Sequence, residues 1–234
     1  SLNTNLIKEL REKTGAGILD CKSALSENKN DIEKAIDWLR KKGLSVAAKK
    51  SGRVAAEGLI GNKIQGDLGC IIEINSETDF VSRNEIFQNF VKNCSLLALK
   101  SDGNIETLNK MKYLNTDNSV EEELTKNIAT IGENLNIRRI EYIKLDDEGL
   151  IVSYIHNSVT ENLGKIGVLI ALKSKADKMI LMDLGKKIAM QIAATNPQSI
   201  NIKNLNIDLV DKERSILIEQ ALSSGKPREI AEKM

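Results

Sequence analysis

The sequence is poor in aromatic residues, since only 3% of its 234 residues are Phe, Trp or Tyr. A core must therefore be built mainly from Ile, Leu, Val and Ala, and the stacking surfaces that bind single-stranded nucleic acid are not expected. Neither sign of charge is in excess, because 34 basic residues stand against 33 acidic ones. The resulting net charge of +1 gives no general attraction to nucleic acid or to an acidic membrane surface.

Residues that ligate metals or act as nucleophiles are also scarce. The three cysteines, Cys21, Cys70 and Cys94, are isolated, no CxxC pair occurs, and the single histidine, His156, is far from all of them in the sequence. No zinc site is expected from this set. Free and mostly buried thiols are typical of a reducing compartment. His156 has no evident Ser or Cys partner in sequence, although a partner brought close by the fold stays open.

Signals for export, membrane insertion and nucleotide binding are missing as well. The first residues are too charged for a signal peptide, and no apolar run approaches the roughly 18 residues of a membrane span. A transit peptide that had already been removed would leave no trace. There is no GxxxxGK[ST] loop and no GxGxxG after a strand. The sequence therefore favours a binding or regulatory protein over an enzyme.

What is present begins with three short helices, predicted between Thr4 and Ser51 from apolar residues at helical spacing. Asn30 followed by Glu33 predicts a capping box at the third helix, and Gly43 predicts its end. The small, basic and glycine-containing stretch 47–53 is typical of a linker.

Beyond the linker the pattern changes to mixed α and β. The order strand, strand, helix occurs twice, which indicates two related lobes, and the stretch 104–118 is expected to be irregular. The last residues lie inside a helical pattern without a cap, which is typical of a fragment. Strands are predicted at 54–65, 70–75, 136–145, 150–156 and 166–172, and helices at 86–98, 119–132, 176–194 and 208–223.

Asp79 and Phe80 stand at the junction between a predicted buried strand and a predicted helix. Two explanations stay open. An apolar ring beside a carboxylate on a rigid junction can be a wedge for a partner's pocket. Alternatively, Asp79 or Ser82 caps the helix and Phe80 packs onto the core. Capping turns are the commoner case, so the residues alone favour the second explanation.

Several blocks, in the same order along the whole chain, resemble the translation elongation factor Ts family, the guanine nucleotide exchange factors of elongation factor Tu. The blocks are KELREKTGAGILDCK at 8–22, AAKK at 47–50, ETDFV at 77–81, IGENLNIRR at 131–139, KIGVL at 165–169, GKP at 225–227 and IAEKM at 230–234.

The resemblance implies an α+β protein. It divides the chain into a ubiquitin-associated-like three-helix module at 1–46, a linker at 47–53, and a core of two related α+β subdomains at 54–145 and 146–234. The second subdomain is expected to be truncated before a coiled coil and a C-terminal segment.

In function, the resemblance implies a non-catalytic exchange factor in translation elongation that needs no cofactor and no metal. Its partner would be the GTPase domain of elongation factor Tu, without direct contact to nucleic acid or membrane. The expected location is the bacterial cytoplasm, or alternatively an organelle matrix after removal of a transit peptide.

The resemblance also assigns partner-binding residues. Asp79 and Phe80 would enter the GTPase domain near its magnesium site, and His156 would lie near its phosphate-binding loop. Ile18 would touch the partner, although it also fits the apolar stripe of its own helix as a core residue. The residues assigned to partner binding are Ile18, Leu19, Thr78, Asp79, Phe80, Val81 and His156.

Two rival classes make different predictions. A general interaction adaptor, in which the three-helix module does the binding, predicts that Phe80 is buried in a scaffold. An enzyme that uses His156 as a base needs a polar pocket that converges on this histidine.

Overall fold

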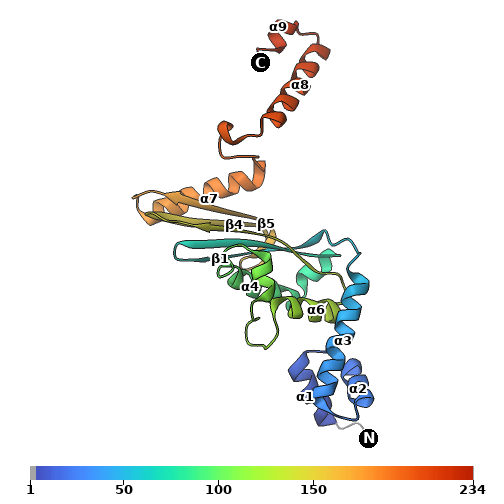
Figure 1. Ribbon diagram of the computed structural model, residues 1–234. Coiled ribbons are helices and arrows are strands. Elements are labelled where there is room, and N and C mark those ends of the chain that lie inside the picture. Colours follow the sequence, from blue (N-terminus) through green and yellow to red (C-terminus); the bar gives the residue numbers. More distant parts are fainter. Residues whose placement is uncertain (1–3, 234) are drawn as a thin grey trace. The chain divides into compact units, whose positions relative to one another are not determined.

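The computed structural model describes residues 4–233 and divides the chain into two units, Ser1–Ala193 and Ala194–Met234 (Figure 1). Residues 1–3 of the expected module and Met234 of the last sequence block lie outside the described residues.

The first unit begins with the three expected helices, α1 (Thr4–Thr14), α2 (Ile18–Glu27) and α3 (Ile32–Lys50). They enclose a small apolar core, and Trp38 packs half-buried at its flank. The buried residues of this core are Ile7, Leu10, Cys21, Ala24, Leu25 and Ala35. The three-helix prediction is confirmed, while the likeness to a ubiquitin-associated fold stays a prediction.

The predicted limits of α3 are wrong at both ends. Its N-cap is Asp31, whose side chain accepts a hydrogen bond of 3.1 Å from the backbone N–H of Lys34, because Asn30 is in a left-handed turn with φ 63°. The helix also runs on through Gly43, which is buried and faces Ala129 of α6 (Val120–Ile131). Gly43 therefore permits close helix packing, and residues 47–50 of the expected linker are helical.

Five strands form one antiparallel sheet in the order β3-β2-β1-β5-β4. β1 and β5 pair in register at Ile60↔Gly164 and Gly61↔Leu163. The expected boundary between residues 145 and 146 falls between strands at opposite edges of the sheet, and it stays a prediction. The strands are β1 (Glu57–Gln65), β2 (Leu68–Ser76), β3 (Asn136–Lys144), β4 (Gly149–Thr160) and β5 (Leu163–Lys173).

Helices cover the sheet as the repeated strand, strand, helix order predicts. α4 (Glu85–Ala98) contacts β1 and β2 and buries Phe87 and Phe90 completely. α7 (Lys178–Thr195) lies against β4 and β5, where Gly185 approaches Val152 and Leu172. The stretch expected to be irregular contains a short helix, α5 (Ile105–Lys110), so that expectation is wrong in part.

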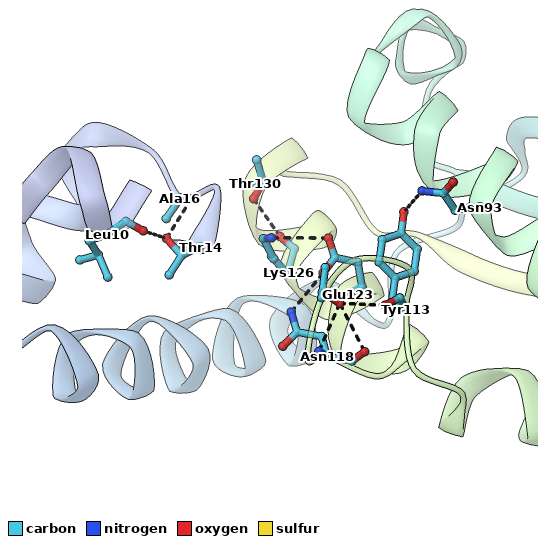
Figure 2. Close-up of polar contacts among 10 residues, drawn as sticks. Leu10, Thr14, Ala16, Asn93, Tyr113, Asn118, Glu123, Lys126 and Thr130 are labelled. Atoms are coloured by element: carbon cyan, nitrogen blue, oxygen red, sulfur yellow. Dashed lines mark hydrogen bonds and ion pairs between the residues drawn. The ribbon is translucent and has the colours of Figure 1, made fainter. Parts of the chain in front are cut away.

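α6 begins with a capping box formed by Ser119 and Glu122, and both of its reciprocal hydrogen bonds are present. Its buried Glu123 accepts a hydrogen bond of 3.1 Å from the side-chain amide of Asn118 and lies 3.5 Å from Lys126 Nζ, as Figure 2 shows. On the same helix, Glu122 pairs with Arg40 of α3 at 2.6 Å. α6 therefore belongs to the sheet's core and also contacts the N-terminal helices.

The second unit consists of η2 (Ile202–Asn204), α8 (Ile207–Ser223) and α9 (Arg228–Ala231). Helix α8 follows the predicted range closely and is capped by Asn206, whose side chain accepts from the backbone N–H of Asp208. No residue of α8 is buried within the described structure.

Candidate partner-binding surface

Asp79 and Phe80 begin a 3-10 turn, η1 (Asp79–Arg83), between β2 and α4. Phe80 is 80% exposed. The N-cap of α4 is Asn84, which accepts from the backbone N–H groups of Ile86 at 2.9 Å and Phe87 at 3.2 Å. The capping explanation is therefore wrong, because neither Asp79 nor Ser82 caps the helix and Phe80 does not pack onto the core.

The two residues that follow Phe80 face the interior. Val81, expected at the partner surface, is buried in the core cluster, and Ser82 is 3% exposed. The Ser82 hydroxyl donates to the carbonyl of Gly58 at 3.1 Å, and the Gln88 side-chain amide donates to the Ser82 carbonyl at 2.8 Å. The turn thus holds Phe80 outward because its next two residues are anchored inside.

The segment before Phe80 is tied to the loop after α6. The Glu133 carboxylate accepts from the backbone N–H of Thr78 at 3.0 Å and from its hydroxyl at 2.6 Å. Glu77 in turn accepts from the backbone N–H of Asn134 at 2.7 Å. The sequence blocks at 77–81 and 131–139 therefore meet in space. Sequence reasoning did not select Glu133 as a neighbour of this turn, and its place in a quoted block is the only signal for it.

Lys165 of β5 reaches the other side of the same turn. Its ammonium group donates to Ser82 Oγ at 2.9 Å and to the Gly58 carbonyl at 3.0 Å, and it lies 3.6 Å from the Glu57 carboxylate. Lys165 was also not selected from the sequence, although it opens the block at 165–169.

His156 is exposed on β4, where it pairs in register with Ile166 of β5. Its Nδ1 lies 2.9 Å from the Tyr154 hydroxyl. Both residues are on the same strand two positions apart, so their side chains share one face. Within residues 4–233 no three His, Cys, Asp or Glu side chains gather as metal ligands.

Ile18 and Leu19 lie in the first turn of α2 and are 49% and 78% exposed. The expectation that Ile18 is a core residue is therefore wrong. The core position of this helix is taken by Cys21 one turn later, which is fully buried. Leu19 and Ile18 form an apolar surface on the N-terminal helices, separate in the chain from the Phe80 turn.

All three thiols are free and buried, as the composition predicts. Burial raises the pKa of Cys70 to about 11 and raises the pKa values of Cys94 and Cys21 as well. At neutral pH these groups are thiols rather than thiolates, so they are poor nucleophiles. Among the helices of residues 4–233, none has the length and apolar character needed to cross a membrane.

Comparison of the sequence with known proteins identifies the family of this chain. The family described as elongation factor TS matches residues 77–234. The chain is 51% identical over 233 residues to elongation factor Ts of Rhodospirillum centenum, which covers 100% of this chain and 76% of that protein. It is 49% identical over 229 residues to elongation factor Ts of Allorhizobium ampelinum, which covers 98% of this chain and 74% of that protein. The chain therefore belongs to the elongation factor Ts family, whose members promote nucleotide exchange on elongation factor Tu during translation elongation.

Proposed function

We propose that this chain releases GDP from elongation factor Tu by inserting Phe80 into the GTPase domain beside its magnesium site, with Asp79 altering the local charge. The observation that carries the proposal is the 80% exposure of Phe80 on a turn anchored from both sides. A large apolar ring in water has no stabilising role in the free protein, but it gains about 1.5–3 kcal/mol when a partner buries it. The adaptor alternative predicts a buried Phe80 and disagrees with this exposure.

The anchoring of the turn matters for binding energy. Ordering a loop during association consumes part of the interaction free energy. In this chain the turn already has Val81 and Ser82 buried and Thr78 hydrogen-bonded to Glu133. Little further ordering is then needed when Phe80 enters a pocket, so more of the binding free energy is available to weaken the partner's affinity for the nucleotide.

Release then follows from linkage and requires no covalent chemistry. A nucleotide held at nanomolar affinity is bound by roughly 12 kcal/mol. An exchange factor weakens it only by binding the empty partner better than the loaded one, and the coupling is reciprocal. Displacing groups that support magnesium would weaken the metal and phosphate contacts together.

The other exposed residues extend the same proposal. His156 would contact the GTPase domain near its phosphate-binding loop, and Ile18 and Leu19 would add an apolar contact from the N-terminal module. We place this activity in the bacterial cytoplasm, since the relatives named above are bacterial proteins.

The test uses Phe80→Ala and the matched control Phe87→Ala in the same chain. Release of fluorescent GDP from elongation factor Tu should slow strongly with Phe80→Ala while the unfolding midpoint stays near that of the parent. Phe87→Ala, which empties a fully buried site, should instead destabilise the fold by about 3–5 kcal/mol. If Phe80→Ala exchanges at the parental rate, the wedge proposal is wrong.

A further inference from the structure

We infer that Lys165 is a positioning residue for nucleotide exchange, because it holds the turn that carries Phe80 through the buried Ser82. This inference rests on the proposed function of Phe80. Lys165 itself does not need to touch the partner, since its ammonium group points to the interior anchor of the turn.

Three polar groups under the turn are each hydrogen-bonded to the other two. The Gly58 carbonyl accepts from the Ser82 hydroxyl at 3.1 Å and from Lys165 Nζ at 3.0 Å, and Lys165 Nζ also donates to Ser82 Oγ at 2.9 Å. Hydrogen bonds from a charged donor are roughly twice as strong as neutral ones. The set fixes Ser82, and Phe80 lies only two residues before it.

Gly58 supplies a backbone position that other residues do not adopt readily. Its φ is +130°, and a Cβ at this position would lie 2.2 Å from the carbonyl oxygen of Ile74. A side chain is excluded on both grounds. The direction of the Gly58 carbonyl toward Ser82 and Lys165 therefore depends on glycine at this position.

The ion pair with Glu57 does not explain the position of Lys165. The Nζ–carboxylate distance is 3.6 Å and the Glu57 side chain is 52% exposed, so the pair contributes little to stability. The Ser82 residue, by contrast, is 3% exposed. Removing the donor of an acceptor buried to this degree costs more stability than breaking an exposed ion pair. The stronger contacts of Lys165 are thus those to the turn.

The place of Lys165 in β5 links the turn to the rest of the sheet. It directly follows Leu163 and Gly164, which form the two residue pairs between β5 and β1. It directly precedes Ile166, which pairs with His156 of β4. One short stretch of β5 therefore sets the positions of both Phe80 and the strand that carries His156.

The experiment is a double-mutant cycle between Lys165→Met and Phe80→Ala, read as the rate of fluorescent GDP release from elongation factor Tu. Lys165→Met should slow release about tenfold, within the loss that a misplaced positioning group produces. In the Phe80→Ala background the same change should cost less than about twofold, because the ring that Lys165 positions is already gone. Lys173→Met on the same strand, which removes an exposed ion pair with Asp146, is the control and should leave release unchanged.

A purely structural role for Lys165 gives a different result. It would slow release by the same factor with and without Phe80, in parallel with a loss of stability, and that result would overturn the inference. If Lys165→Met does not fold, Ser82→Ala removes the shared hydroxyl with a smaller change and should show the same dependence on Phe80. Normal release by Phe80→Ala alone would contradict the proposed function itself, whereas slow release by Phe80→Ala with normal release by Lys165→Met would contradict only the role of Lys165.

Discussion

Glu133 is joined to Thr78 by two hydrogen bonds, one from the backbone N–H at 3.0 Å and one from the hydroxyl at 2.6 Å, across 55 residues of sequence. Each carboxylate oxygen takes one of the two donors. This pairing holds the residue two positions before Phe80, while Ser82 is held two positions after it by Lys165. The exposed ring therefore lies between two fixed points.

We expect Glu133→Gln to slow nucleotide release with little change in stability. A glutamine amide offers one acceptor oxygen in place of two, so one Thr78 donor loses its partner. Because Thr78 is exposed and can bond to water, the loss in unfolding free energy should stay below about 1 kcal/mol. Denaturant unfolding and GDP release measure the two effects. Glu121→Gln on the exposed face of α6 is the control, and equal release by the two variants would contradict the prediction.

The chain should bind nucleotide-free elongation factor Tu much more tightly than the GDP-bound form, and added magnesium with GDP should dissociate the complex. A factor with equal affinity for both states shifts no equilibrium, however tightly it binds. Titration calorimetry against each form measures the difference. Equal dissociation constants would rule out release by destabilisation of bound nucleotide.

Truncation within α3 should separate binding from stability. The helix contributes Ala35 to the N-terminal core, while Ala47 packs against the core of the sheet and Arg40 pairs with Glu122. Removal of residues 1–38 should weaken partner binding and leave the core's unfolding midpoint unchanged. Removal of residues 1–50 should lower that midpoint as well, because it uncovers α6. Circular dichroism during denaturation distinguishes the two truncations, and identical midpoints would contradict the prediction.

Alkaline pH should destabilise the fold through Tyr113. Burial raises the pKa of Tyr113 to about 12, against the opposing effect of the hydrogen bond from Asn93. The folded state therefore favours the neutral phenol, and its contribution is fully present below about pH 10 and is lost as the pH rises toward 12. A shift of this size corresponds to at most about 2–3 kcal/mol.

Urea unfolding at pH 9 and pH 11 tests this expectation. The parent should lose more stability between the two values than Tyr113→Phe, which has no phenol to ionise. Some loss should persist in the variant, since burial raises the pKa of Cys70 to about 11. An unchanged difference between parent and variant at both pH values would show that Tyr113 does not contribute.

Regular local patterns gave correct predictions. The three N-terminal helices and the five strands all appear in the structure. The prediction that α3 ends at Gly43 is wrong because this glycine has a tertiary role. It allows α3 to approach α6, and the local sequence contains no information about that neighbouring helix. The sequence does not predict the helix α5, because its six residues in a polar stretch are too few to show apolar residues at helical spacing.

The site was predictable only in part. The residues themselves favoured a cap at Asp79 or Ser82, and only the resemblance pointed to an exposed Phe80. Whether a turn residue faces water depends on which neighbours are buried, in this case Val81 and Ser82. Glu133 and Lys165 come from 55 and 83 residues away from their partners in the turn, so no spacing rule connects them.

The continuity of α3 has a geometric consequence for the two exposed surfaces. A residue inserted between Leu39 and Gly43 would rotate everything before it by about 100° around the helix axis and shift it by about 1.5 Å. Ile18 and Leu19 would then face a new direction, while the Phe80 turn would stay where it is. The number of residues in this helix therefore sets the angle, measured around the helix axis, between the Ile18 and Leu19 surface and the Phe80 turn. For that reason α3 should tolerate exposed substitutions far better than any change in its length.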